Sequence, residues 1–561
     1  MRAFPAMLVA TVLLAACAPA REASRSRTAA PAPAAAAPKR ITAGVMGNPH
    51  TVYYFLGTSS VIPGVDALQE LVGANLAIAD PFEALQPQLA ETVPSLANGL
   101  WQVSPDGRME TTWKLRRDAT WHDGVPFTAQ DVVFTDQLSR DRELPQFRQP
   151  ATQNLVESVE APDPHTVVVK WRAPYFEADQ PFGVPLPAHL LQEAAATNKA
   201  EFINLDYWSK DFVGTGPYRV REFERGSHIV LEAFAGYVLG RPKIGTIEVR
   251  FIPDPNTLLT NVFAGEVELT LGRAFSPDQA LDARTRWNDG KIEFGASYIH
   301  RVMPQLANPN PPVLAELPFR QALFYAMDRQ EMADTIFAGM TSVPRSVLIP
   351  NQPQYRELEA GVPQYAFDPR RAAQLIESLG YAKGADGLYA LAGQRLPNVE
   401  LRATGGDDSR LKVFYAIADQ WQRAGVGVDI LVLTQAQNQD REFRAKRPAM
   451  VLTGGVANLG QLSSFISTEA PTAENNYLGT NFGSWANPRY DELYARYLVT
   501  LPRPERNQVL AEMLRVLAAE VPIYPILYQV DATAIGNRLS GVSPYAFGPK
   551  AWNSHLWDVT R

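Results

Sequence analysis

The residue types that commonly perform covalent catalysis occur in this chain, but not in the spacings that such catalysis requires. The 561 residues contain no G-x-x-x-x-G-K-[ST] phosphate loop, no G-x-S-x-G nucleophile elbow and no H-E-x-x-H zinc motif. The seven histidines are isolated, with no pair four residues apart: His50, His122, His165, His189, His228, His300 and His555. Because zinc ligands usually show local spacing, we expect no metal site, no cofactor and no catalytic residue. A metal site assembled from distant parts of the chain stays open.

Carboxylates are the remaining groups that could perform acid–base chemistry. Whether two of them pair is a property of the fold and cannot be read from spacing. Asp386, Asp407 and Asp408 lie in polar stretches, and we expect them to be solvated. The chain is therefore predicted not to be an enzyme, and a secreted hydrolase that uses carboxylates in a cleft remains the alternative.

One glycine-rich segment superficially resembles a phosphate-binding loop. Gly214–Tyr218 reads GTGPY, but the residues from Tyr218 to Phe223 have the pattern of a strand. A loop that holds phosphate should lead into the N-terminus of a helix. We therefore interpret this segment as a tight structural turn.

The single cysteine, Cys17, suggests a lipid anchor. The apolar run Ala6–Ala16 has 11 residues, which suits the core of a signal peptide and is shorter than the roughly 20 residues of a membrane-spanning helix. Its end, Leu14-Ala15-Ala16-Cys17, resembles the lipobox of bacterial lipoproteins, which implies acylation of the thiol and cleavage before it. The alternative is an ordinary signal peptide with an incidental cysteine. A lone thiol cannot form an intramolecular disulfide.

The segment 18–40 is predicted to be a disordered tether, because it is rich in Ala and Pro and has no large apolar residue. It carries five basic residues against one acidic residue, whereas the whole chain has a net charge of −7. A basic tether suits an anionic membrane surface, and an acidic body argues against nucleic acid as a partner. We expect an exported protein, lipid-anchored on the outer face of the cell membrane.

The body that would position any site alternates strand and helix patterns, which indicates an α/β fold. Short runs rich in β-branched residues predict strands at His165–Trp171, His228–Phe234, Thr246–Ile252, Asn398–Ala403, Val426–Leu433 and Ala449–Thr453. Apolar residues at helical spacing predict helices that begin at Pro318, at Pro369 and at Leu411. Strands separated by helices in the second half imply a parallel arrangement. The first half has more strand and less regular helix.

Four separated segments together resemble the bacterial extracellular solute-binding proteins of the peptide/nickel-binding family (family 5), which serve ABC importers. They are Thr112–Thr135 with its Trp-His-Asp-Gly turn, Gly214–Tyr218, Pro318–Arg329 (PFRQALFYAMDR), and a diffuse set formed by Phe367-Asp368-Pro369, Gly380-Tyr381 and Asn487–Asp491. In the first segment, Asp123-Gly124 suits a tight turn and Thr128 can cap a helix. This segment is expected to build structure rather than to contact ligand.

The resemblance implies a two-lobed periplasmic-binding-protein-like fold with a hinge. The first lobe would take residues 41–297, with an inserted subdomain, and recover the chain at 521–561, whereas the second lobe would take residues 298–520. It also implies that a small solute or peptide binds between the lobes of a monomer and is passed to ABC permease subunits in the membrane. A sensory or scaffold role without transport is a further alternative.

The ligand is expected to contact the segment after the Ala449–Thr453 strand. Peptide-binding members of the family carry a Trp and an acidic residue there, whereas this chain has Gly454, Gly455, Val456 and Asn458. Without an acid to pair with an amino terminus, an ordinary peptide ligand is in doubt and a sugar or another neutral solute is an option. A cleft-facing loop and a simple turn are equally open interpretations. Further candidate ligand-binding residues are Tyr53, Tyr54, Gln305, Asn308 and Trp485.

Overall fold

The computed structural model describes residues 39–56, 64–80, 84–147, 155–180, 183–350, 352–405, 407–456, 459–543 and 551–560. These residues belong to one compact unit, Lys39–Arg561. Cys17 and the predicted signal peptide lie outside the described residues, as does nearly all of the predicted tether. Within the described ranges, no helix combines the length and the apolar content needed to cross a membrane.

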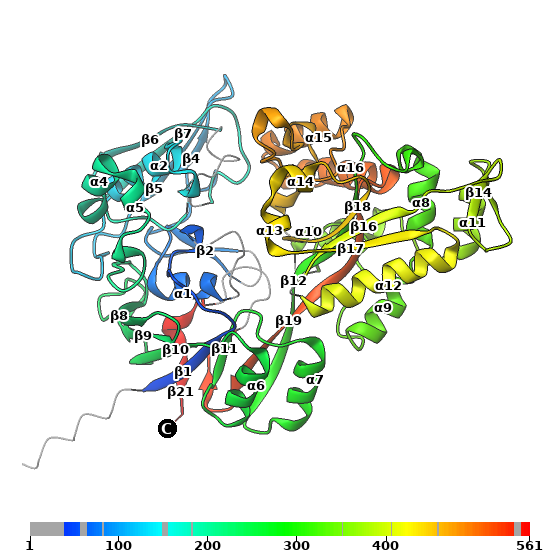
Figure 1. Ribbon diagram of the computed structural model, residues 1–561. Coiled ribbons are helices and arrows are strands. Elements are labelled where there is room, and N and C mark those ends of the chain that lie inside the picture. Colours follow the sequence, from blue (N-terminus) through cyan, green and yellow to red (C-terminus); the bar gives the residue numbers. More distant parts are fainter. Residues whose placement is uncertain are drawn as a thin grey trace, which may run out of the picture. The chain divides into compact units, whose positions relative to one another are not determined.

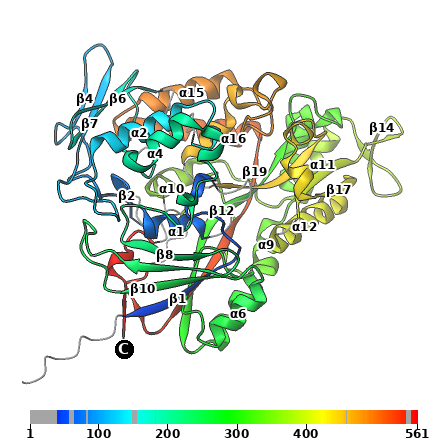
Figure 2. The ribbon, with the colours of Figure 1, turned by 60° about the vertical axis from the view of Figure 1, so that its left-hand side comes forward.

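The largest sheet of the unit has ten strands, and its central strands come from distant parts of the chain (Figures 1 and 2). In spatial order the strands are β17 (Val428–Leu433), β16 (Val399–Thr404), β18 (Met450–Val456), β12 (Gly290–Pro304), β19 (Tyr524–Gly536), β11 (Leu269–Leu271), β1 (Arg40–Val45), β10 (Thr246–Phe251), β9 (His228–Ala233) and β8 (Tyr218–Glu224). β16 pairs in parallel with both β17 and β18, as the sequence predicts, whereas β12 pairs antiparallel with β18 and β19.

A second sheet of four antiparallel strands lies within the first half of the chain. Its order is β4 (Trp101–Val103), β5 (Met109–Lys114), β7 (Thr166–Trp171) and β6 (Val156–Asp163). Three small sheets complete the strands: β2 (Ala77–Ala79) with β3 (Leu85–Pro87), β13 (Ala382–Lys383) with β14 (Tyr389–Leu391) and β15 (Gln394–Arg395), and β20 (Leu539–Ser540) with β21 (Asp558–Val559).

Three of the helices that pack around these sheets correspond to the predicted ones. They begin at Leu317, at Pro369 and at Asp408, the last being three residues before the predicted start at Leu411. In the first half the helices are α1 (Val65–Val72), α2 (Ala129–Arg140), α4 (Ala188–Thr197), α5 (Lys199–Phe202), α6 (Pro255–Phe263) and α7 (Pro277–Arg286). In the second half they are α8 (Leu317–Tyr325), α9 (Arg329–Ile336), α10 (Pro353–Leu358), α11 (Pro369–Glu377), α12 (Asp408–Ala424), α13 (Gln435–Gln439), α14 (Arg441–Ala445), α15 (Pro488–Val499) and α16 (Arg503–Glu520). The predicted helix at Pro318 is shorter than its apolar pattern, because Asp328 caps a new helix, α9.

Two of the family-like segments bind each other and have a structural role. Gly214 donates its N–H to Nδ1 of His122 (3.1 Å), and Nε2 of His122 contacts the carbonyl of Gly216 (3.0 Å). A Cβ on Gly216 would lie 2.4 Å from the backbone carbon of Val72 at the end of α1, so this turn requires glycine. Thr128 and Asp131 form the capping box of α2, as predicted for Thr128.

Candidate functional site

The predicted ligand-contacting glycines lie inside a strand, and the prediction of a loop or turn at this point is wrong. Gly454 and Gly455 belong to β18 and pair with His300 and Ile299 of β12. The strand continues past Thr453 because β12 offers a backbone neighbour that no local pattern reveals. Val456 is the last residue of β18, and Asn458 lies outside the described residues.

Both glycines make room for large side chains that start on β12. A Cβ on Gly454 would lie 2.9 Å from the ring of Tyr298, and a Cβ on Gly455 would lie 2.6 Å from the guanidinium carbon of Arg301. Side chains alternate between the faces of a strand, so Tyr298 and Arg301 lie on opposite faces of the sheet. Each glycine therefore allows one β12 side chain to lie against the backbone of β18.

On the Gly454 face, one carboxylate is held between two guanidinium groups. Oδ2 of Asp407 accepts hydrogen bonds from Arg273 (2.8 Å) and from the hydroxyl of Tyr298 (3.1 Å), and lies 3.5 Å from Nη2 of Arg410. The hydroxyl of Tyr298 in turn accepts from Arg273 (2.9 Å) and Arg410 (3.2 Å). Ser409 donates to Oδ1 of Asp407 (2.7 Å). These residues are called the Asp407 cluster below.

The Asp407 cluster joins elements that are far apart in sequence. Arg273 follows β11 directly after Gly272, which has a positive φ of 77°. Tyr298 lies at a bulge in the β12–β19 pairing, and Asp407 is the N-cap of α12, where it accepts from the backbone N–H of Arg410. Burial tends to raise the pKa of Asp407, but the charges of Arg273 and Arg410 together with these hydrogen bonds hold it well below its usual range.

The prediction that Asp407 is solvated is wrong, because its side chain is only 8% exposed and ion-paired. Asp386 and Asp408 are exposed, as predicted. The sequence did contain a signal for the role of Asp407 as a helix cap. Asp407 is followed by Asp408-Ser409 and then by an apolar stripe, which is typical of a helix start. Its burial depends on Arg273, which is 134 residues away in sequence.

On the Gly455 face, Arg301 is buried without a carboxylate. The residue is 5% exposed, and its one hydrogen bond to the described part of the chain joins Nη1 to Oε1 of Gln461 at 3.4 Å. Nε of Arg301 has no hydrogen-bond partner. Burial lowers the pKa of Arg301 to about 10. Sequence reasoning missed this residue, because β12 also carries other polar and charged residues and no local motif marks Arg301.

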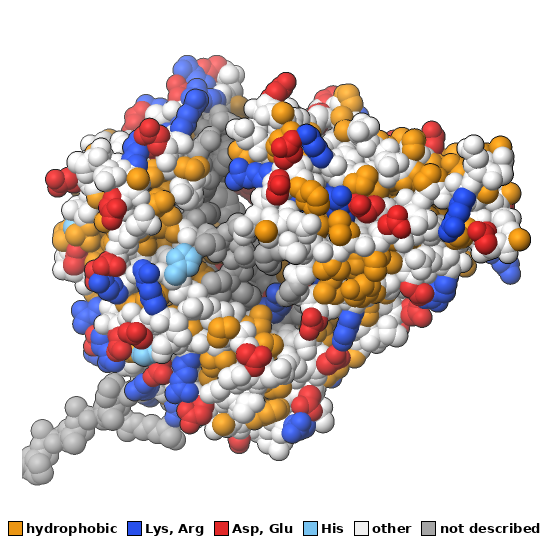
Figure 3. Space-filling view, viewed as in Figure 1, with side chains coloured by type: hydrophobic (Ala, Val, Ile, Leu, Met, Phe, Trp, Pro, Cys, Tyr) orange, Lys and Arg blue, Asp and Glu red, His pale blue; other side chains and the backbone are white. Residues whose placement is uncertain are grey.

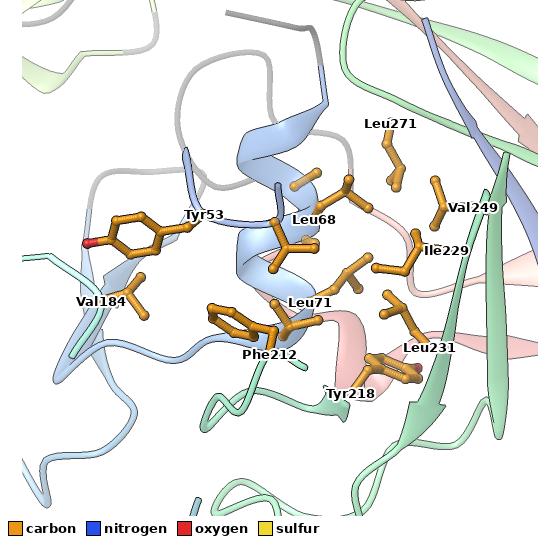
Figure 4. Packing of buried hydrophobic residues seen from close by; sticks show 14 of the residues in the cluster. Tyr53, Leu68, Leu71, Val184, Phe212, Tyr218, Ile229, Leu231, Val249 and Leu271 are labelled. Atoms are coloured by element: carbon orange, nitrogen blue, oxygen red, sulfur yellow. The ribbon is translucent and has the colours of Figure 1, made fainter. Parts of the chain in front are cut away.

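The other predicted ligand-binding residues are mostly parts of the core. Tyr53 is 4% exposed and packs against Phe147 and Trp208 and beside Val184 (Figure 4). Trp485 is also buried and packs on Tyr490.

Three further candidates are positioned by backbone contacts or lie at the surface. Gln305 is buried and donates to the carbonyl of Ala445 (3.0 Å). The N–H of Tyr54 donates to Gln69 (2.7 Å), whereas Asn308 is exposed. Of the predicted residues, Gly454 and Gly455 lie against charged side chains, those of Arg410 and Arg301.

His300 of β12 predicts a pH-dependent contribution to stability. It is fully buried next to the Asp407 cluster, where Nε2 lies 2.6 Å from Oε1 of Gln529, and burial lowers its pKa to about 4. The folded protein thus keeps this ring neutral, while the unfolded chain protonates it below about pH 6.5. The contribution of His300 is complete above that pH and is lost as the pH falls toward 4.

We expect His300→Gln to remove this pH dependence. Between pH 7.5 and pH 5, the free energy of unfolding of the wild type should fall relative to that of the variant by about 2 kcal/mol. Urea denaturation of both proteins at each pH measures this difference. A difference that stays constant over the range would show that the ring is accessible to protons in the folded state.

Comparisons with known proteins agree with this architecture. The family model of bacterial extracellular solute-binding proteins, family 5 (Middle), matches residues 91–476. A relative from Brucella ovis, named as a candidate ABC transporter peptide-binding protein, is 27% identical over 311 residues, and this chain spans 55% of that relative's length. The oligopeptide-binding protein AppA of Bacillus subtilis is 23% identical over 483 residues, which cover 83% of each chain.

Among solved structures, NikA from Brucella suis in complex with Fe(III)-EDTA superposes with a TM-score of 0.75 at 20% identity, covering 93% of this chain and all of NikA. At this identity the superposition establishes the fold: a two-lobed binding protein of mixed α/β structure. It does not transfer a ligand.

Proposed function

Because this chain belongs to the bacterial extracellular solute-binding proteins of family 5, we propose that it is an extracytoplasmic receptor for an ABC importer. The match of the family model over residues 91–476 carries the proposal. The receptor would capture a small organic solute, either a peptide-like or a neutral one such as a sugar, and deliver it to permease subunits. The proposal contains no covalent step, and the Asp407 cluster does not favour a hydrolase, because two guanidinium groups keep its carboxylate ionised.

The order of strands supports a division into two lobes at residues 41–297 with 521–561 and at residues 298–520. Five strands of the proposed first lobe, from β11 to β8, lie at one end of the large sheet, and β17, β16 and β18 lie at the other. The long antiparallel strands β12 and β19 connect the two ends (Figure 1). A pair of extended strands that crosses between lobes is suited to act as a hinge.

Besides the β12–β19 connection, Phe176 of the proposed first lobe contacts helices α15 and α16 of the proposed second lobe, which supports closure over a ligand. The N–H of Phe176, which follows β7, donates to the carbonyl of Leu498 in α15 (3.1 Å). Its ring lies 4.8 Å from that of Tyr497, and the guanidinium of Arg506 in α16 lies 4.4 Å from its centroid. In the proposed mechanism, ligand binding stabilises this closed arrangement, which the permease then recognises.

The location in the cell is part of the proposal. Export and lipid attachment through Cys17 rest on the sequence alone, and a monomeric receptor fits a body with its own core. On the face shown in Figure 3, basic and acidic side chains are interspersed. A lipid anchor would raise the local concentration of the receptor near its permease.

Native mass spectrometry of the purified protein tests the receptor function. We expect a retained small molecule, seen as a mass above that of the chain that disappears on denaturation, or a gain in melting temperature with at least one member of a peptide and sugar panel. If no molecule is retained and no compound raises the melting temperature, the receptor proposal fails. Turnover of a bound sugar or ester would instead favour the hydrolase alternative.

A further inference from the structure

We propose that Arg301 binds an oxyanion of the captured solute, a carboxylate or a phosphate ester, at the carboxyl end of β18. This inference rests on the proposed receptor function and specifies the chemistry of the solute. In place of a fully neutral ligand, it predicts one with at least one anionic group. The side chain of Arg301 has fewer hydrogen bonds to described residues than those of Arg320 and Arg329, which are buried to a similar extent.

Two other buried arginines of the described chain each donate to three backbone carbonyls. Arg320, also 5% exposed, donates to the carbonyls of Leu314 (3.0 Å), Ala315 (2.7 Å) and Glu520 (2.9 Å). Arg329 is likewise bonded to three carbonyls: those of Pro344, Pro525 and Tyr365. The guanidinium groups of Arg320 and Arg329 have structural partners that account for their burial. Arg447, also buried, has two long bonds, to the carbonyls of Arg444 and Met303 (3.4 Å each).

Arg301 lacks comparable partners. Among the described residues, its one hydrogen bond, to Gln461, is long, and no acidic side chain lies within ion-pair distance. Gln461 does not neutralise the charge of Arg301, because its Oε1 is an uncharged acceptor. Its amide nitrogen donates to the carbonyl of Val347 (2.7 Å). A buried charge without a partner costs several kcal/mol, so its retention calls for a partner that arrives from outside. Guanidinium groups bind carboxylates and phosphates by paired hydrogen bonds.

The position of Arg301 in the sheet suits a ligand. β18 runs parallel to β16, and ligands of open α/β sheets bind beyond the carboxyl ends of parallel strands. The guanidinium lies directly against Gly455, the penultimate residue of β18. Any side chain at position 455 would displace it. The absence of a side chain at Gly455 therefore allows Arg301 to place its positive charge at the carboxyl end of β18.

Chemical blocking of acids tests the inference with the wild-type protein. A small-molecule extract of bacterial culture is divided into a mock-treated part, a part methylated with trimethylsilyldiazomethane, and a part treated with alkaline phosphatase. Each part is incubated with ligand-depleted protein, and native mass spectrometry measures the bound mass. We expect binding from the mock-treated part and none from the methylated part. Loss after phosphatase identifies a phosphate ester, and retention identifies a carboxylate.

The outcomes separate this inference from the receptor function. Equal binding from the mock-treated and methylated parts would overturn the oxyanion proposal and leave the receptor function intact. Binding from neither part would contradict the receptor function itself.

A pair of matched variants provides the second measurement. Arg301→Met should leave the melting temperature of the ligand-depleted protein unchanged or higher, because it removes an unpaired buried charge, and should weaken binding by about 10- to 100-fold. Arg320→Met, at equal exposure, should lower the melting temperature while keeping the preference for unmethylated solute. Full affinity in Arg301→Met would overturn the proposal. If that variant does not fold, Arg301→Lys, which keeps the charge but loses the paired geometry, should bind with intermediate affinity.

Discussion

Replacing Gly216 by alanine is expected to destabilise the protein by about 3 kcal/mol or more. The added Cβ would meet the backbone carbon of Val72 at 2.4 Å and the backbone nitrogen of Gly73 at 2.5 Å. Neither atom belongs to a flexible side chain, so α1 or the turn must shift. The shift would also disturb the contact between Gly216 and His122.

Urea denaturation of Gly216→Ala measures this loss, and Gly361→Ala is the matched control. The nearest atom to a Cβ at position 361 belongs to the side chain of Arg515, at 3.9 Å, so the control should change the free energy of unfolding by less than about 0.5 kcal/mol. Similar values for the two variants would show that the turn at Gly214–Tyr218 adapts to a side chain without cost.

Replacing Asp407 by asparagine is expected to cost about 3 kcal/mol. The change removes the negative charge that lies between Arg273 and Arg410 and leaves two partly buried cations close together. The folded pKa of Asp407 lies below that of the unfolded chain, so its contribution is complete above about pH 4 and is lost as the pH falls through the folded pKa. The difference between wild type and variant should therefore be constant from pH 8 to pH 5 and shrink below pH 4.

Asp419→Asn on the same helix is the control, because Asp419 and its partner Arg423 are both about 60% exposed. It should cost less than about 0.5 kcal/mol in urea denaturation. The double variant with Asp407→Asn and Arg273→Met should recover part of the lost stability, since it removes one of the two cations. A double variant with the summed loss of the two single variants would show that these side chains do not interact.

Much of the fold could be predicted because its signals are local. The strands at Thr246–Phe251 and Val399–Thr404 and the helix that begins at Pro369 all follow from apolar periodicity and capping residues within ten positions. The family-like segments extended these predictions to the architecture. Their residues, such as Thr128 at the start of α2, build structure that local sequence describes well.

The site could be predicted only in part, because it depends on contacts between distant residues. The ligand-binding role of Gly454 and Gly455 stays a prediction, and their place in a strand follows from pairing with β12, about 150 residues earlier. Arg301 and Arg273 carry no local motif. Tyr53 has the residue type of a ligand-binding wall, and only the packing of Phe147 and Trp208 against it shows that it belongs to the core.

The place of β19 in the sheet has a consequence for the order of folding. β19 lies between β12 and β11, so without it the large sheet consists of one group of four strands and one group of five with no backbone hydrogen bonds between them. While the chain is being synthesised, the two groups can form separately, but they cannot join until residue 536 has left the ribosome. Pairing over such a sequence distance is slow, because the entropy of closing the loop is lost before the contacts form. The last steps of folding are therefore expected to be the insertion of β19 and, with it, the formation of the hinge.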